Sequence, residues 1–267
     1  VLHFHVDGLH FPLFREFAHK ALTTVHGRLD LPKLEPLYRQ SCGAPLVSIS
    51  HSQRAPLPQA NWLATVHHGL PDGVCPLNPS PPRGEGRYLA FLGRASPEKR
   101  LDRAIDIARA AGMRLRIAAK IDPPDGPYWR SRIAPQLADP MIEYVGEVDE
   151  AGKPAFLGNA TALLFPIDWP EPFGLAMIEA MSCGTPVIAW PNGAAPEIVD
   201  EGVTGFLAGS IPEAVEALRR AARLDRMLVR ERFEQRFSAA RMARDYLAAY
   251  RALGRRRMLR AVGAPAA

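Results

Sequence analysis

Short apolar runs alternate with helical periodicity along the chain from residue 88 onward. Tyr88 to Leu92 is one apolar run, and the apolar residues from Leu101 to Ala111 then recur at intervals of three or four positions. The repeated pattern predicts strands at 88–92, 115–119, 142–145, 162–166, 186–190 and 206–208, and helices at 97–111, 128–137, 150–159, 173–183 and 195–199. This alternation is typical of a doubly wound parallel sheet, whose ligand lies outside the carboxyl ends of the strands.

The part of the chain before residue 71 is shorter and less regular. It predicts four strands at 1–6, 21–25, 46–49 and 62–66, with one helix at 34–41, and resembles the end of another α/β domain. Residues 71–86 are dense in Pro and Gly and indicate a linker. The predicted organisation is a partial N-terminal domain (1–70), the linker (71–86), a complete Rossmann-like domain (87–237), and a C-terminal helix with a basic tail (238–267).

The composition excludes several classes of protein. With 47% hydrophobic and 23% charged residues, the chain is neither disordered nor collagen-like. Its three Cys residues show no CxxC pairing, which argues against a disulfide framework or a zinc ribbon and favours a reducing, cytoplasmic compartment. No apolar run is long enough to predict a transmembrane helix.

The net charge of +5 is concentrated near the C-terminus. Fourteen Arg residues between Arg219 and Arg260 stand against four acidic residues. The favoured interpretation is the solvated faces of terminal helices; the alternative is a weak peripheral contact with an anionic membrane face through Arg251 to Arg260. Because no aromatic residues interleave with the charges, we expect no nucleic-acid partner.

Glu171 and Glu179 flank the start of the helix expected at 173–183. Glu171 precedes it, Glu179 lies about six residues inside, and six residues rise about 9 Å. The free N–H groups between the two carboxylates form an anion site, so a sugar nucleotide, with hydroxyls at each end and a diphosphate between, would fit. Alternatively, Glu171 is a helix-start acid and Glu179 a surface residue. Apolar neighbours such as Met177 and Met181 nevertheless predict that Glu179 is buried and needs a partner.

The stretch from Glu171 to Glu179 resembles the E-x7-E signature of retaining GT-B glycosyltransferases of family 4. Gly93-Arg94-Ala-Ser-Pro-Glu-Lys99 is similar to that family's G-R-x-x-x-E-K motif. The resemblance implies a GT-B fold in which Arg94 and Lys99 hold the donor diphosphate, since Arg offers a planar fork and Lys a point charge.

The resemblance assigns the other site residues as well. The helix N-terminus at Phe173, Gly174 and Leu175 would assist with the diphosphate. Glu171 would bind the hydroxyls of the transferred sugar and Glu179 those of the ribose. His26, in Thr-Thr-Val-His-Gly, is similar to a histidine at a strand end of the family's N-terminal domain and is expected against the donor sugar, although a plain turn histidine is an equal alternative.

Two further motifs are interpreted as scaffold. Gly193 to Val199 and Gly202 to Phe206 resemble the family's G-G-x-P-E-I-V and G-x-x-G-F/L blocks, with Ala194 in place of a second Gly. We expect His51, His67 and His68 to be structural, with 67–70 forming the hinge before the linker.

The implied function is transfer of a hexose from an NDP-sugar, UDP-glucose above all, to an acceptor hydroxyl with retention of configuration. No metal site and no cofactor are expected, because the chain has neither D-x-D nor HExxH. The acceptor stays open among saccharide, lipid and small metabolite. Alternatives are a nucleotide-binding chain without catalysis, and a sugar-nucleotide epimerase or phosphorylase relative of the same fold.

The family pattern also includes an initial strand and a Gly-rich loop, which Val1 and the residues after it do not supply. We therefore expect that about a hundred N-terminal residues are absent, that this chain binds nucleotide but transfers little, and that an unpaired sheet edge lowers its solubility.

Overall fold

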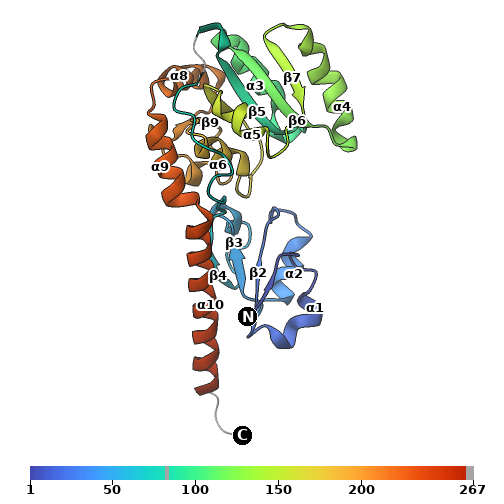
Figure 1. Cartoon of the computed structure of the whole chain (residues 1–267). Coiled ribbons are helices and arrows are strands. Elements are labelled where there is room, and N and C mark those ends of the chain that lie inside the picture. Colours follow the sequence, from blue (N-terminus) through green and yellow to red (C-terminus); the bar gives the residue numbers. More distant parts are fainter. Residues whose placement is uncertain (82–83, 263–267) are drawn as a thin grey trace.

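The computed structural model describes residues 1–81 and 84–262 and contains two parallel sheets, one in each of two stacked units (Figure 1). The second unit holds a six-stranded sheet in the order β10-β9-β8-β5-β6-β7. Its strands are β5 (Tyr88–Arg94), β6 (Arg114–Lys120), β7 (Ile142–Gly146), β8 (Ala162–Phe165), β9 (Val187–Ala189) and β10 (Gly205–Leu207). Every neighbouring pair is parallel, as the alternation of strands and helices predicts.

Both faces of this sheet are covered, which explains the continuous apolar runs. Tyr88 and Ala90 of β5 face one core, whereas Leu89 and Phe91 face the other. The helices that contribute to the first core are α5 (Lys153–Gly158), α6 (Leu175–Ser182), α7 (Ala195–Ile198) and α9 (Arg226–Phe237). The second core receives α3 (Leu101–Ala111), the segment 126–138 and α8 (Ile211–Ala221).

Two predicted helices differ from the structure. The helix expected from Pro97 is divided: a 3-10 turn, η4 (Pro97–Lys99), precedes α3, and Arg100 between them has a left-handed φ of 54°. Ion pairs from Arg100 to Asp102 and Asp168 hold this strained residue. The break ends the first turn at Lys99, a residue of the candidate site.

The helix expected at 128–137 is irregular. After the 3-10 turn η5 (Pro123–Asp125), one α-helical turn, α4 (Gly126–Tyr128), continues as a π-helical turn, η6 (Trp129–Ile133), and a 3-10 turn, η7 (Ala134–Ala138). Pro135 lacks an N–H group, so regular α-helical hydrogen bonding stops there. Two other helices begin later than predicted: α5 follows Gly152 and α6 follows Gly174.

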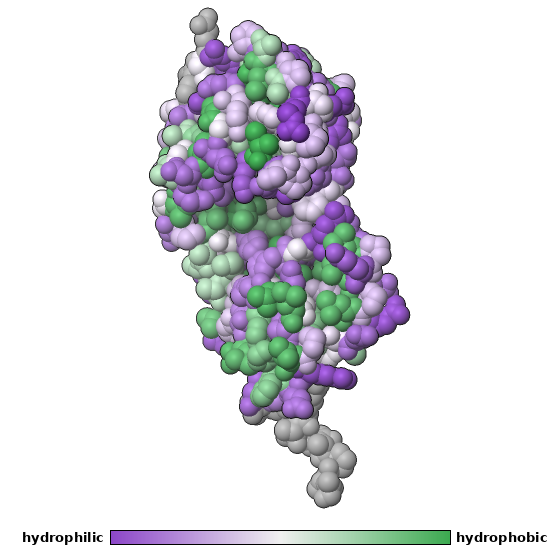
Figure 2. All heavy atoms as spheres, turned by 90° about the vertical axis from the view of Figure 1, so that its right-hand side faces the viewer, coloured by the Kyte–Doolittle hydropathy of each residue, from purple (hydrophilic) through white to green (hydrophobic). Residues whose placement is uncertain are grey.

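The first unit is a four-stranded parallel sheet in the order β1-β2-β3-β4. Its strands are β1 (Leu2–Phe4), β2 (Ala21–Thr24), β3 (Leu46–Ser48) and β4 (Trp62–Thr65), and its helical segments are α1 (Phe11–Phe14), η1 (Arg15–Phe17), α2 (Leu34–Gln40) and η2 (Ser52–Arg54). β1 lies at the sheet edge, and apolar side chains gather on the surface of this unit (Figure 2), where Leu9 and Leu13 are 83% and 80% exposed. The expected solubility cost of this edge stays a prediction.

The C-terminal helix returns to the first unit. α10 (Ala239–Val262) runs along the first sheet (Figure 1), where Leu253 packs with Leu22, Val47 and Val66. The two chain crossings between the units lie side by side, because Leu70 N donates to Phe237 O (2.9 Å) and Ala239 N donates to Leu70 O (2.8 Å). The rest of the connection from β4 to β5 contains the short turn η3 (Gly84–Gly86).

The basic C-terminal region is only partly a solvated surface, so the favoured sequence interpretation is wrong for four arginines. Arg226, Arg230, Arg236 and Arg241 each donate to backbone carbonyls of other segments. Arg226 is buried and reaches the carbonyls of Asn78, Gly158 and Ala160. The side chains of Arg256, Arg257 and Arg260 lie outside the described residues, so membrane contact stays a prediction.

The structure also bears on the expectations for membrane-spanning helices and for the cysteines. In the described part of the chain, none of the helices combines the length and the apolarity needed to cross a membrane. Cys42, Cys75 and Cys183 are free thiols, of which Cys75 and Cys183 are buried.

Candidate active site

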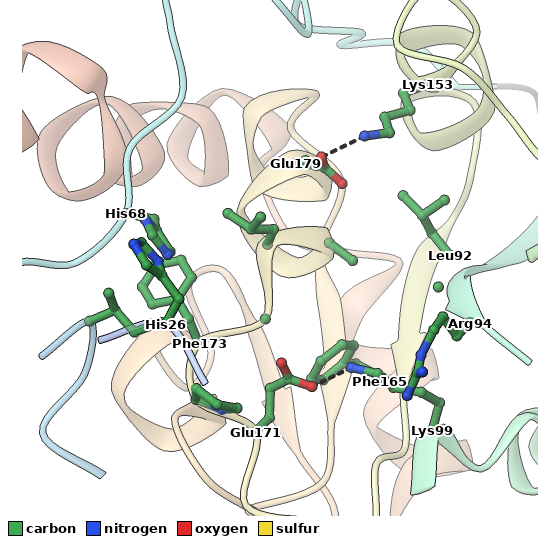
Figure 3. A pocket seen from close by; sticks show the side chains of 16 residues that line it. His26, His68, Leu92, Arg94, Lys99, Lys153, Phe165, Glu171, Phe173 and Glu179 are labelled. Atoms are coloured by element: carbon green, nitrogen blue, oxygen red, sulfur yellow. Dashed lines mark hydrogen bonds and ion pairs between the residues drawn. The ribbon is translucent and has the colours of Figure 1, made fainter. Parts of the chain in front are cut away.

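A pocket of about 570 Å³ lies between the two units, in the hollow visible at the waist of the molecule (Figures 2 and 3). It sits at the carboxyl ends of strands: Arg94 ends β5, Phe165 ends β8, and His26 follows β2. All eight site residues proposed from the sequence line it: His26, Arg94, Lys99, Glu171, Phe173, Gly174, Leu175 and Glu179. The structure therefore brings together residues from both units.

Glu171 is held by two donors at one oxygen. Lys99 Nζ forms an ion pair with Oε2, and Trp169 Nε1 donates to the same atom at 3.0 Å. Lys99 also lies 5.2 Å from the ring centre of Trp169 and 5.6 Å from that of Phe165, within cation–π range. Lys99 and Glu171 were expected to have separate tasks, whereas the structure pairs them in the pocket wall (Figure 3).

The backbone of Glu171 is fixed by the motif that the sequence analysis interpreted as scaffold. Gly193 has a φ of 58°, and a Cβ added there would lie 2.3 Å from the backbone N and O of Glu171. Ala194 N donates to Glu171 O at 2.9 Å. The Gly193-Ala194 pair thus places the loop that carries Glu171.

Glu179 has the partner that its burial required, and that partner is Lys153 of α5. Lys153 Nζ lies 2.8 Å from Glu179 Oε1 and also contacts Glu150. Burial opposes the charge on Lys153, but its hydrogen bonds to Glu150 and Glu179 outweigh this and raise its pKa. Lys153 lines the pocket and was not foreseen; the only signal in the sequence was that Glu179 needed a partner.

The helix α6, whose start is expected to form an anion site, begins two residues later than predicted. Gly174, with a φ of 90°, precedes the helix, and a Cβ there would lie 2.6 Å from Met177 Cε. Leu175 and Ala176 line the pocket at the first helical turn. The N–H groups and the positive dipole end of this turn favour an anion.

Arg94 differs from Lys99 in its exposure. Its side chain is 46% exposed, donates to Glu98 at 2.6 Å, and lies 3.8 Å from Asp122. These are surface ion pairs, which hold a guanidinium only weakly. Arg94 can therefore turn toward an anionic ligand at little cost.

The first unit contributes histidine rings to the opposite wall. His26 Nε2 and His5 Nδ1 share a hydrogen bond of 2.8 Å. His68 lines the pocket, stacks on His26 with ring centres 5.4 Å apart, and meets Phe173 edge-on at 4.9 Å. His68 was expected to be structural; the structure places it in the pocket wall, and its role stays a prediction.

The ring of His68 is held neutral. Burial, followed by the neighbouring charges of His26 and Arg241, lowers the pKa of His68 to about 4. Within residues 1–81 and 84–262, no group of three or more His, Cys, Asp or Glu side chains is placed to hold a metal ion.

Comparison with known proteins gives a consistent family match. Residues 78–240 match the family model of glycosyl transferases group 1. The chain is 28% identical over 162 residues to the phosphatidyl-myo-inositol mannosyltransferase of Mycobacterium tuberculosis, a match that covers 58% of this chain and 42% of that protein. The chain thus spans less than half the length of the curated relatives that it matches.

Two solved structures share the fold. Sucrose-phosphate synthase from Thermosynechococcus elongatus superposes with a TM-score of 0.75 at 20% identity, covering 94% of this chain and 72% of that one. HepE of Anabaena, solved with UDP and glucose, gives a TM-score of 0.70 at 18% identity, covering 85% and 70% of the two chains. The predicted α/β GT-B fold with Rossmann-like units is confirmed.

Proposed function

The chain belongs to the glycosyl transferases group 1 family, and from that premise we propose that it transfers a hexose from an NDP-sugar to an acceptor hydroxyl with retention of configuration. The observation that carries this proposal is the set of groups that line one pocket: Glu179 and Glu171 lie apart in it, Arg94 and Lys99 lie on the side of Glu171 (Figure 3), and the α6 N-terminus also lines it. Two carboxylates, two cations and a helix N-terminus match the hydroxyls and the diphosphate of a sugar nucleotide.

In this proposal the two carboxylates bind opposite ends of the donor. Glu179, fixed by Lys153, accepts hydrogen bonds from the ribose hydroxyls. Glu171 accepts them from the transferred sugar, since its backbone and one oxygen are already fixed by neighbours. UDP-glucose is the donor that we favour, and the HepE structures solved with UDP and with UDP-glucose support this choice by shared fold.

Cationic groups replace a metal ion in the proposed reaction. As the bond between the sugar and the diphosphate breaks, negative charge develops on the leaving phosphate, where Lys99, Arg94 and the α6 N–H groups stabilise it. The acceptor hydroxyl attacks from the face that the nucleotide leaves and passes its proton to the leaving phosphate oxygen, and His26 orients the sugar from the other unit. No cofactor takes part in this scheme.

The experiment follows nucleotide release from UDP-glucose and a panel of other NDP-sugars, with and without EDTA, in the presence of saccharide, lipid and small-metabolite acceptors. The expected transfer by this chain is small, but it should persist in EDTA and fall about 100-fold in Glu171→Gln. Dependence on Mg²⁺ or Mn²⁺ would contradict the metal-free scheme, and nucleotide binding without release would favour a non-catalytic chain.

A further inference from the structure

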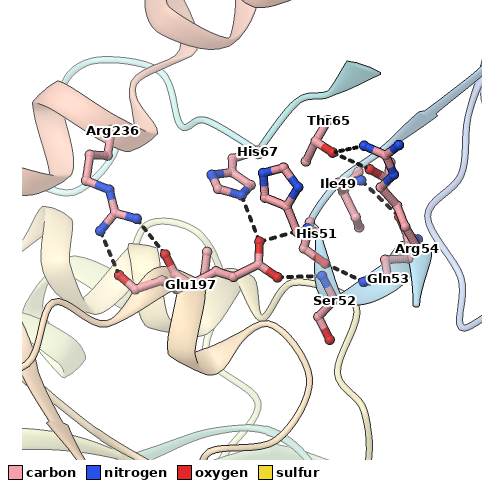
Figure 4. A network of polar contacts seen from close by, with 12 residues as sticks. Ile49, His51, Ser52, Gln53, Arg54, Thr65, His67, Glu197 and Arg236 are labelled. Carbon is pink, nitrogen blue, oxygen red and sulfur yellow. Dashed lines mark hydrogen bonds and ion pairs between the residues drawn. The ribbon is translucent and has the colours of Figure 1, made fainter. Parts of the chain in front are cut away.

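Glu197 belongs to α7 of the second unit, but its carboxylate reaches the first unit (Figure 4). His51 N donates to Oε2 at 2.7 Å, and Ser52 N donates to Oε1 at 2.5 Å. These two N–H groups begin the 3-10 turn η2, where free backbone donors attract a carboxylate. Glu197 therefore caps a turn of the opposite unit from across the cleft.

Glu197 is itself held in place. Arg236 Nη2 donates to its backbone carbonyl O at 2.5 Å, and His67 Nε2 lies 3.3 Å from its carboxylate Oε2. Burial opposes ionisation of Glu197, but hydrogen bonds from His67 and from the backbone of His51 and Ser52 outweigh it and lower its pKa. A charged and fixed acceptor makes a stiff link between the units.

The capped turn leads directly to a buried amide. Gln53, only 5% exposed, accepts a hydrogen bond from Ile49 N at 2.9 Å. Its Nε2 donates to Val25 O at 3.0 Å and to Gly27 O at 2.8 Å. Because Val25 and Gly27 stand on either side of His26, Gln53 fixes the backbone of His26 from both directions.

We propose that Glu197 is a positioning residue which, through Ser52 and Gln53, sets the place of His26 against the donor sugar. This inference rests on the proposed function, in which His26 contacts the sugar. It gives the Pro196-Glu197 motif, interpreted from the sequence as scaffold, a role in the reaction. The effect of Glu197 on the reaction rate should be measurable, because a displacement of about 1 Å at a reacting group lowers the rate about 100-fold.

A carboxylate cap within a single unit supplies the matched control. Glu213 Oε2 accepts a hydrogen bond from Gly209 N at 2.8 Å at the start of α8, so Glu213→Gln removes a similar cap without touching the link between units. A purely structural role for Glu197 predicts that both substitutions lower the melting temperature and that neither one changes the environment of His26.

The test is a double-mutant cycle that compares kcat in wild-type and His26→Ala backgrounds. Glu197→Gln places an amide NH2 against one of the two N–H donors, so we expect kcat to fall about tenfold while Kd for UDP stays within about twofold. In a His26→Ala background, Glu197→Gln should lower kcat by less than about twofold. An unchanged kcat in Glu197→Gln, or an equal loss of kcat in both backgrounds, would contradict the proposal that Glu197 positions His26.

Two further measurements keep the test decisive. The ¹⁵N resonances of the His26 imidazole should move in Glu197→Gln and not in Glu213→Gln, a readout that does not depend on transfer activity. If Glu197→Gln does not fold, Glu197→Asp and Gln53→Ala replace it in the same cycle. A wild-type protein that neither binds UDP or GDP nor transfers sugar would refute the proposed function. His26 resonances that do not move in Glu197→Gln would refute only the positioning role of Glu197.

Discussion

Lys99 and Glu171, 72 residues apart in the sequence, form an ion pair inside the pocket, with side chains only 17% and 12% exposed. Each side chain is thus oriented by the other before a ligand arrives. A donor diphosphate would draw Lys99 toward its phosphates, and the sugar hydroxyls would take the place of Lys99 on Glu171. Donor binding would therefore exchange the partners of Lys99 and Glu171, whose side chains are already ordered without it.

The two carboxylates should affect kinetics differently. Glu171→Gln removes the acceptor that orients the transferred sugar, so we expect kcat to fall about 100-fold. Glu179→Gln weakens only the contact with ribose and should chiefly raise the donor KM. Steady-state kinetics with varied UDP-glucose separates these effects, and equal losses in kcat alone would contradict the assignment.

Lys153→Met should raise the donor KM about tenfold, an effect of about 1.4 kcal/mol. The reason is that Glu179 loses its partner and is no longer held toward the ribose. Lys33→Met, at an exposed position of the first unit, is the control. The role of Lys153 would be refuted if both variants bound donor as wild type does.

Arg226→Met should destabilise the fold by about 3 kcal/mol or more, because three buried carbonyls lose a charged donor. The exposed Arg223→Met should stay within about 0.5 kcal/mol of wild type. Urea unfolding followed by circular dichroism measures both. Equal stability of the two variants would show that Arg226 belongs to the solvated surface after all.

Stability should fall on mild acidification, in part through His68. Its pKa is lowered to about 4 in the fold, below the value of about 6.5 for an unfolded chain. The neutral ring therefore contributes its full stability above about pH 6.5, and this contribution is lost as the pH falls toward 4.

The unfolding midpoint of His68→Gln, compared at pH 7 and pH 5, tests this expectation. The variant should lose less stability between the two values than wild type does. His19→Gln, at an exposed position, should keep the wild-type pH dependence. If His68→Gln also kept it, the ring would not be buried as a neutral group.

The sequence predicts the elements and motifs that are determined within one short segment of the chain. The apolar runs of β5 and β6 give strands buried on both faces, and the motifs around Arg94 and Glu171 place residues within one or two turns of each other. Contacts between segments were missed. Lys153 reaches Glu179 from a separate helix, and no local periodicity specifies that approach.

The same limit applies to the link between the units. His68 lines the pocket close to the crossing where Leu70 pairs with Ser238, and Glu197 reaches Ser52 only once both units are formed. Propensity and spacing describe one element at a time, whereas these contacts depend on how the units pack. The break at Arg100 between η4 and α3 has the same origin, since an ion pair with Asp168 holds the strained backbone of Arg100.

Nucleotide binding to this chain tests the central claim most directly. Calorimetric titration with UDP and with GDP should show saturable binding at one site per chain. Arg94→Ala combined with Lys99→Ala should weaken it at least about tenfold, because both charges face the same phosphates. Lys33→Ala combined with Arg219→Ala, both at exposed positions away from the pocket, should leave it unchanged. A folded sample that binds neither nucleotide, or a double variant at Arg94 and Lys99 that binds as wild type does, would contradict the account.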